Sequence, residues 1–248
     1  MRVTRSWVDL PLAAGARLEL PEAAAAHLVR VLRLREGDAC VLFNGDGHDH
    51  RARIVESGKR RTVVEILDAE PVDRESPLRI TLLQGIARGE KMDLVLQKAT
   101  ELGVARIVPV ESARSEVRLD GARLARRIEH WRAVVVAACE QCGRARLPVV
   151  EAPVPVSAVA DAAGAPGLRL TLDPQGGHTL ASLAPRLPAD DAVAIAIGPE
   201  GGWSQGDRGQ LHAAGFEGLR LGPRILRTET AGLAAIAALQ ALYGDLRI

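Results

Sequence analysis

Short apolar segments and longer amphipathic segments alternate from residue 78 to the C-terminus. No other feature of the 248-residue chain restricts its fold as much. When a helix follows each strand, the chain can return along the sheet and add the next strand parallel to the previous one. This alternation predicts an α/β fold with a mostly parallel sheet covered on both faces. Strands are predicted at 78–84, 106–110, 168–172, 192–197 and 218–221, and helices at 90–102, 121–142 and 230–243.

The N-terminal part has a different pattern, in which short segments carry β-branched or alternating residues. Asn44 and Gly45 are typical of a tight hairpin turn, and Pro21 suits the first position of a helix. This pattern indicates a small β-barrel, and a boundary between Pro71 and Pro77 divides the chain into domains 1–72 and 73–248. In the first domain strands are predicted at 17–20, 39–43, 48–56 and 61–67, and a helix at 22–33.

Composition excludes several classes of protein. Hydrophobic residues make up 47% of the chain, yet no apolar run approaches the roughly 20 residues that span a bilayer. The N-terminus lacks the apolar core of a signal peptide, so the expected location is the cytoplasm. Cys139 and Cys142 are expected to be one buried and one half-buried thiol, and His48 and His50 a solvated turn, so no metal is expected.

Charge is close to balanced overall but uneven along the chain. The net charge is only +1, whereas the segment from Ser112 to Leu147 contains eight arginines and four acidic residues. Such a local excess suits contacts with phosphates, and it suits a solvated helix face equally well. Charge alone therefore leaves both interpretations open.

A glycine-rich loop, Gly198-Pro-Glu-Gly-Gly202, directly follows the predicted strand 192–197. In parallel sheets, ligands bind beyond the carboxyl ends of strands, and glycines let the backbone approach a ligand closely. The loop matches neither the GxGxxG nor the GxxxxGK[ST] pattern. Because Glu200 would repel a phosphate, the loop favours a ligand without one, such as S-adenosylmethionine.

A second loop, Leu221-Gly-Pro-Arg-Ile-Leu-Arg-Thr-Glu-Thr-Ala231, joins a predicted strand to the last helix. Capping of that helix by Thr228 or Thr230 would explain the threonines. Capping does not explain why Arg224, Arg227 and Glu229 stand beside apolar residues. This loop is therefore a second candidate for the functional site.

Four stretches together resemble the ribosomal RNA small subunit methyltransferase E family, the 16S rRNA uridine-N3 methyltransferases of the SPOUT superfamily. The order of the stretches matches the family over nearly the whole chain, and Trp203 stands where the family more often has Phe. The four stretches are 90–104, 140–144, 197–203 and 221–231.

The resemblance implies a PUA-like barrel followed by a SPOUT domain with a C-terminal trefoil knot, a homodimer, and S-adenosylmethionine as methyl donor. The predicted helix 230–243 is apolar nearly all round, which suits a subunit interface. The residues that the resemblance assigns to the cofactor are Leu172, Gly198, Pro199, Glu200, Gly201, Gly202, Leu221, Gly222, Ile225, Leu226 and Thr228.

Methylation at uracil N3 requires loss of a proton whose pKa is roughly 9 to 10. The negative charge that develops on the uracil oxygens would be stabilised by Arg227 or Arg224. Glu200 or Glu229 is the candidate base or base-orienting group. A structural Glu–Arg pair that only stiffens the loops is an equally good interpretation.

The RNA, or the whole small ribosomal subunit, is expected to be held largely through phosphates, because the chain has few aromatic residues for stacking. Two other functions stay open: a ribose 2′-O-methyltransferase of the same superfamily, and a non-catalytic RNA-binding module of ribosome assembly. The candidate RNA-binding residues are Arg2, Arg5, Arg30, Arg33, Arg114 and Arg144.

Overall fold

The computed structural model describes residues 4–58, 61–115, 121–164, 167–183, 185 and 192–246. Their contacts divide the chain into two compact units. The first unit contains Met1–Glu75 and also Val136–Leu147, a segment that the sequence placed in the second domain. The second unit contains Ser76–Val135 and Pro148–Ile248. Among the described residues, no helix is long and apolar enough to cross a membrane.

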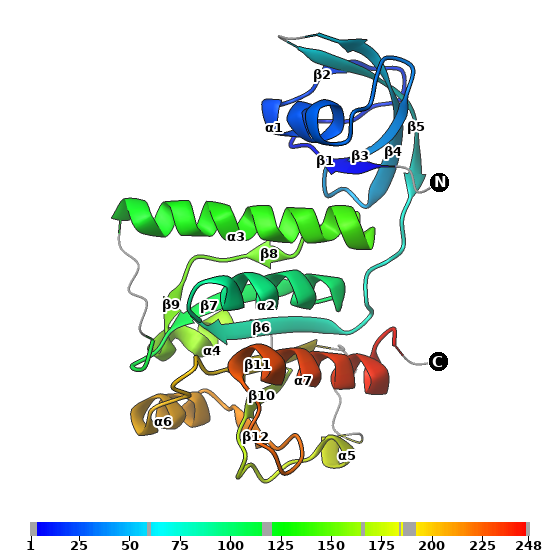
Figure 1. Cartoon of the computed structure of the whole chain (residues 1–248). Coiled ribbons are helices and arrows are strands. Elements are labelled where there is room, and N and C mark those ends of the chain that lie inside the picture. Colours follow the sequence, from blue (N-terminus) through cyan, green and yellow to red (C-terminus); the bar gives the residue numbers. More distant parts are fainter. Residues whose placement is uncertain are drawn as a thin grey trace. The chain divides into compact units, whose positions relative to one another are not determined.

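The first unit is built on a five-stranded sheet in the order β1-β3-β4-β5-β2 (Figure 1). β1 pairs parallel to β3, and the other pairings are antiparallel. The pairings of the described residues form an open path, without the closure that a complete barrel needs. Alternate residues fill a core that includes Leu42, Ile54, Val64 and Ile66. The strands are β1 Arg5–Trp7, β2 Arg17–Glu19, β3 Ala39–Phe43, β4 His48–Ser57 and β5 Thr62–Pro71.

The predicted helix 22–33 is shorter and less regular than expected. It begins as α1 (Glu22–Ala25), continues as a π-helix over Ala26–Val31, and buries Leu28 in the core of the unit. Pro21 precedes α1 as its N-cap with extended backbone, so its predicted place as the first helical residue is wrong. Arg33 has a positive φ of 59°, which ends the helical conformation.

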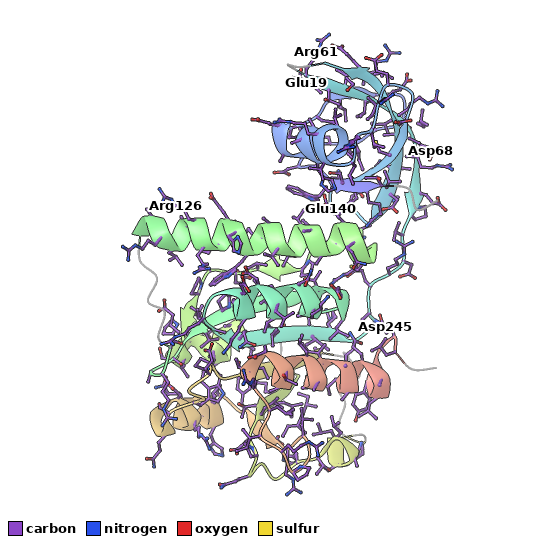
Figure 2. All side chains as sticks on the ribbon, viewed as in Figure 1. Glu19, Arg61, Asp68, Arg126, Glu140 and Asp245 are labelled. Carbon is purple, nitrogen blue, oxygen red and sulfur yellow. The ribbon has the colours of Figure 1, made fainter. Side chains whose placement is uncertain are left out.

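The end of helix α3 (Gly121–Cys142) completes the first unit, and Glu140 in this segment is labelled in Figure 2. Its Oε1 accepts hydrogen bonds from the Ser6 hydroxyl at 3.2 Å and from the Trp7 backbone N–H at 3.0 Å. These bonds tie the helix end to strand β1. They explain why this unit takes in a segment so distant in sequence.

The second unit contains a seven-stranded sheet in which every pairing is parallel, as predicted. The order is β12-β10-β11-β6-β7-β8, and β9 pairs with β7. Strand pairing does not report how the chain threads, so the trefoil knot stays a prediction. The strands are β6 Arg79–Gly85, β7 Arg106–Glu111, β8 Val149–Val150, β9 Val154–Pro155, β10 Leu168–Leu172, β11 Ala192–Ile197 and β12 Glu217–Leu219.

Helices cover both faces of this sheet, and successive side chains of a strand point to opposite faces. On β11, Ala194 and Ala196 belong to a core cluster with Val159 of α4 and Leu211 of α6. Ile197 lies instead beside Gly232 of α7. The helices are α2 Glu90–Glu101, α3 Gly121–Cys142, 3₁₀ helix η2 Val156–Ala158, α4 Val159–Ala162, α5 Leu180–Leu183, α6 Gln205–Ala213 and α7 Thr228–Tyr243.

The last helix, α7, starts two residues before its predicted beginning and packs beside α2. Ile236 is fully buried within this one chain, so it belongs to the core of the unit and cannot test a subunit interface. Half-buried and exposed residues such as Ala234, Ala238 and Leu242 lie on the other side of the helix. Only that outer side is free to meet a partner.

Candidate active site

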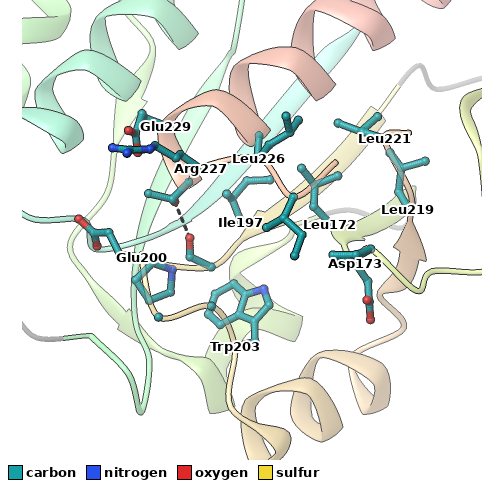
Figure 3. Close-up of a pocket in the computed structure, with 18 of the residues that line it drawn as sticks. Leu172, Asp173, Ile197, Glu200, Trp203, Leu219, Leu221, Leu226, Arg227 and Glu229 are labelled. Carbon is teal, nitrogen blue, oxygen red and sulfur yellow. Dashed lines mark hydrogen bonds between the residues drawn. The ribbon is translucent and has the colours of Figure 1, made fainter. Parts of the chain in front are cut away.

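Three neighbouring strands, β12, β10 and β11, end at one edge of the parallel sheet. The segments that follow them converge with the start of α7 around a cavity of about 560 Å³ (Figure 3). This is the edge at which parallel sheets bind ligands. The residues that line the cavity are Lys91, Leu172, Asp173, Pro174, Ile197, Gly198, Pro199, Glu200, Gly201, Gly202, Trp203, Arg208, Leu219, Leu221, Gly222, Arg224, Ile225, Leu226, Arg227, Thr228, Glu229 and Ala231.

The glycine-rich loop after β11 makes a tight turn that needs glycine at two positions. A Cβ atom at Gly198 would lie 3.0 Å from the Gly202 Cα, and Gly202 has a φ of +64°. The Gly202 N–H donates to the Pro199 carbonyl at 2.8 Å and closes the turn. After the loop, buried Trp203 donates from Nε1 to the Thr171 hydroxyl at 3.2 Å. The loop is thereby fixed to strand β10.

Part of the second loop is exposed where it lines the cavity. Gly222 has a φ of +78° with open space where a Cβ would stand, and Ile225 is 86% exposed. α7 begins at Thr228 with Arg227 as its N-cap, so the predicted capping by Thr228 or Thr230 is wrong. The Thr228 hydroxyl instead donates to the Gly198 carbonyl at 2.5 Å, which joins the two loops across the cavity wall.

Glu200 is held by neighbours that the sequence did not predict. Its Oε1 accepts from the Arg88 backbone N–H at 3.1 Å and from Lys91 Nζ at 3.2 Å. Partial burial acts to raise the pKa of this carboxyl, but backbone hydrogen bonds and the Lys91 ammonium outweigh it and lower the pKa below its ordinary value. Glu200 is therefore ionised at neutral pH. Its ionic partner is Lys91, so the predicted Glu–Arg pair is wrong for this carboxylate.

Glu229, Arg227 and Glu200 lie toward the same end of the cavity in the view of Figure 3, whereas Leu219 and Leu221 lie toward the other. Glu229 Oε2 is inaccessible to solvent and has no hydrogen-bond partner among the described residues. A buried carboxylate oxygen without a partner costs free energy, and Glu229 is one of the residues that line the cavity.

The structure brings together every residue that the sequence assigned to the cofactor and to catalysis, since all of them line this one cavity. Eight lining residues were not predicted: Lys91, Asp173, Pro174, Ile197, Trp203, Arg208, Leu219 and Ala231. Lys91 and Trp203 stand inside the stretches that carry the family resemblance, so the sequence held a signal for them. Asp173 follows β10 directly and was accessible to the same strand-end argument that found the glycine-rich loop.

Two of the predicted RNA-binding arginines are buried structural groups, and their prediction is wrong. Arg5 forms an ion pair with Asp49 at 2.6 Å, donates to the Cys139 carbonyl at 2.8 Å and lies 4.5 Å above the Phe43 ring centre. Arg144 is buried and pairs with Glu75, with 3.1 Å from Nε to Oε1. Neither guanidinium is accessible to a phosphate.

The other four candidates differ among themselves. Arg30 and Arg33 are exposed, and Arg30 approaches Glu22 at 3.5 Å. Arg114 is exposed but donates to the Gly201 carbonyl at 2.8 Å, so it supports the glycine-rich loop. Arg2 lies outside the described residues.

The remaining sequence predictions concern thiols and histidines. Cys139 is buried and Cys142 is half-buried, as predicted. His50 is largely buried and lies 3.0 Å from Asp46, so its prediction as a solvated residue is wrong. Among the described residues, no group of three or more His, Cys, Asp or Glu side chains could hold a metal ion.

Comparison with known proteins gives consistent matches along the chain. Residues 74–240 match the family model of an RNA methyltransferase domain, and residues 20–67 match that of an RNA methyltransferase PUA domain. Ribosomal RNA small subunit methyltransferase E of Buchnera aphidicola subsp. Schizaphis graminum is 31% identical over 99% of this chain and 98% of its own. The protein of the same name from Bacillus subtilis is 29% identical over 88% of this chain and 89% of its own.

Solved structures agree with these relatives. A crystal structure of ribosomal RNA small subunit methyltransferase E from Neisseria gonorrhoeae bound to S-adenosylmethionine superposes with a TM-score of 0.91 and 40% identity, covering 99% of this chain and 100% of that one. A methyltransferase of Legionella pneumophila in complex with the same cofactor superposes with a TM-score of 0.93 and 39% identity, with the same coverage.

Proposed function

The chain belongs to the ribosomal RNA small subunit methyltransferase E family, and on that basis we propose that it transfers a methyl group from S-adenosylmethionine to N3 of a specific uridine in 16S rRNA. The observation that carries this proposal is the convergence of the two predicted loops on one cavity at the carboxyl edge of the parallel sheet. Thr228 and Gly198 are 30 residues apart in sequence, yet they join the two loops directly.

The cavity fits S-adenosylmethionine by its size and its lining. Leu172, Ile197 and Leu219 supply apolar surface for a neutral adenine, and the single carboxylate of the glycine-rich loop would repel a phosphate but not a sulfonium. Gly202 and Gly222 both line the cavity with positive φ and open space where a Cβ would stand, which leaves the backbone accessible to a ligand. The bound cofactor supplies a methyl group already activated by the sulfonium.

The protein's own part in the reaction is to manage charge at the target base. Arg227 and Arg224 are exposed residues of the cavity lining, and their guanidinium groups can stabilise negative charge on the uracil oxygens after the N3 proton leaves. Of the two carboxylates, Glu229 is the better candidate to accept that proton or to orient the group that does. Glu200 is already held by Lys91 and the Arg88 N–H.

The first unit is the proposed RNA-binding part of the chain. Arg30 and Arg33 are exposed at the end of its short helix and would contact phosphates, which carry no sequence information. Reading of the target uridine would then depend on RNA shape and on extrusion of the base into the cavity. The proposed substrate is 16S rRNA or the small ribosomal subunit, which places the enzyme in the cytoplasm.

We further propose a homodimer that uses the outer side of α7. A groove there is lined by Ala234 and Ala238 of α7, by Leu180 of α5 and by residues of the 220–226 segment. Four residues of that segment line both the groove and the cavity: Leu221, Gly222, Arg224 and Leu226. Small side chains allow close packing of a second helix. Ala234→Glu should therefore give monomers in light scattering, whereas Ala125→Glu on the exposed face of α3 should not; a wild-type monomer at micromolar concentration would refute the dimer.

One experiment separates the candidate functions. The protein is incubated with labelled S-adenosylmethionine and small ribosomal subunits or 16S rRNA, and the methylated nucleoside is identified by mass spectrometry. The expected product is 3-methyluridine. A 2′-O-methylated nucleoside would mean a ribose methyltransferase, and no transfer to any RNA or subunit would mean a non-catalytic assembly module.

A further inference from the structure

Behind the cavity wall lies Gln84, a fully buried residue near the end of the central strand β6. Its Nε2 donates to the Gly85 carbonyl at 2.9 Å and to the Thr228 hydroxyl at 3.1 Å. The Thr228 hydroxyl in turn donates to the Gly198 carbonyl at 2.5 Å. Gln84 itself is not part of the cavity lining, whereas Thr228 and Gly198 are.

The direction of these hydrogen bonds is fixed by chemistry. Reversing the Gln84 amide would place Oε1 against the Gly85 carbonyl oxygen, and two acceptors repel each other. The Thr228 hydroxyl must therefore accept from Gln84, and its single proton goes to Gly198. One buried amide thus determines the orientation of a hydroxyl that joins the two loops of the site.

The arrangement costs free energy, so the need to fill the core does not explain it. Gln84 Oε1 is buried without a hydrogen-bond partner among the described residues. An unsatisfied buried acceptor costs free energy that an apolar side chain of similar volume would avoid. The strand end is also pressed against the loop, since a Cβ at Gly85 would lie 2.6 Å from Pro199 Cδ. Strand β6 therefore supports the glycine-rich loop from behind.

A second buried glutamine provides a natural comparison. Gln240 is also fully buried and lies at the other end of α7. Its Oε1 accepts from the Ser76 hydroxyl at 2.7 Å, and its Nε2 donates to the Leu102 carbonyl at 2.9 Å. Both glutamines join α7 to the rest of the unit, but only the contacts of Gln84 reach the cavity.

We propose that Gln84 is a positioning residue of the cofactor site, acting through Thr228 to hold the Gly198 carbonyl and the start of α7 in the geometry that binds S-adenosylmethionine. The proposal rests on the proposed function. Loss of Gln84 should leave the Thr228 hydroxyl free to rotate and the two loops free to separate. Cofactor affinity should fall for this reason, although no atom of Gln84 lines the cavity.

The test compares Gln84→Met with Gln240→Met, because each removes one buried amide at similar volume. Gln84→Met should lower the unfolding temperature no more than Gln240→Met, because it also removes the unsatisfied Oε1. Calorimetry with S-adenosylmethionine should show affinity about tenfold weaker for Gln84→Met and changed less than twofold for Gln240→Met. Equal affinity in the two variants, or an unchanged affinity in Gln84→Met, would overturn the proposal.

A double-mutant cycle tests the route through Thr228. Thr228→Val removes the hydroxyl and should weaken cofactor binding, whereas Thr228→Ser keeps the hydroxyl and should restore it. Adding Gln84→Met to Thr228→Val should cause no further loss, since the relay is already broken; additive losses would contradict the mechanism. If Gln84→Met fails to fold, Gln84→Asn withdraws the amide by one methylene and should give the same loss. If the wild type binds no S-adenosylmethionine, the proposed function itself fails.

Discussion

Two arginines of the first unit, Arg5 and Arg144, and two arginines of the cavity, Arg224 and Arg227, lie in opposite environments. The side chains of Arg5 and Arg144 are only 8% and 5% exposed, and both are held by carboxylates. Arg224 and Arg227 are exposed, and among the described residues neither guanidinium has a hydrogen-bond or ion-pair partner. Arginines of one basic stretch therefore need not share a role. A guanidinium whose donors are occupied stabilises the fold, whereas one with free donors can act on a ligand.

The largest change is expected in the stability of the protein when a buried arginine is removed. Arg144→Met would leave Glu75 without its ionic partner, at a cost of about 3 kcal/mol in the free energy of unfolding. Thermal unfolding should show a clear drop in the transition temperature, with cofactor affinity unchanged. Arg30→Met, at an exposed position, serves as the control and should change stability by less than about 0.5 kcal/mol. Weaker cofactor binding at full stability would contradict the structural role of Arg144.

Arg227→Lys tests the other side of the comparison. Lysine keeps the positive charge but loses the planar fork, so stabilisation of charge on uracil should weaken. Turnover in single-turnover experiments at saturating RNA and cofactor should fall by about 10²-fold, with cofactor affinity and unfolding temperature nearly unchanged. A near-normal rate accompanied by lower stability would show that Arg227 belongs with the structural arginines after all.

The exposed arginines of the first unit should give a smaller effect. Replacing Arg30 and Arg33 with Gln removes two candidate phosphate contacts. RNA affinity should fall several-fold, and the dependence of log K on log salt should flatten by a slope of about 1 to 2. Arg51→Gln is the control, because Arg51 is exposed but already paired with Asp68 at 2.5 Å. An equal loss in both variants would mean a general charge effect rather than a binding surface.

The same comparison shows what the sequence could and could not predict. Strand ends and glycine-rich turns are local patterns, so the sequence could predict both loops as candidates for one site, and Gly198 and Gly222 line the same cavity. Burial is not a local property, and charge in a stretch cannot reveal that Arg5 meets Asp49, 44 residues away. For the same reason the sequence could not find the contact of Gln84 with Thr228, which joins residues 144 positions apart.

Gly201→Val illustrates this limit at a single position. From sequence, a valine at Gly201 should block the cofactor and reduce its affinity at least tenfold. In the structure a Cβ at Gly201 would meet Arg114 Cβ at 3.1 Å rather than open space, so the variant would displace a supporting side chain. Gly202→Val is the better test, since its φ of +64° strains any side chain and its Cβ would stand in open space.

The smallest effect is expected from Glu200→Gln. This variant tests whether Glu200 and Glu229 also differ in role, one held by the protein and the other acting on the substrate. The pKa of Glu200 is lowered, so its stabilising contribution is present above its ordinary value near 4.5 and is lost as the pH falls through the lower folded value. Between pH 6 and 9 the carboxylate stays ionised, so it cannot shape the pH dependence of turnover there. Glu200→Gln should slow turnover only a few-fold, with an unchanged pH profile, because the amide can still accept from the Arg88 N–H and Lys91. Glu229→Gln should instead slow turnover much more, since an amide cannot take the N3 proton and Glu229 Oε2 has no partner among the described residues. A larger loss of turnover in Glu200→Gln than in Glu229→Gln would reverse the two assignments.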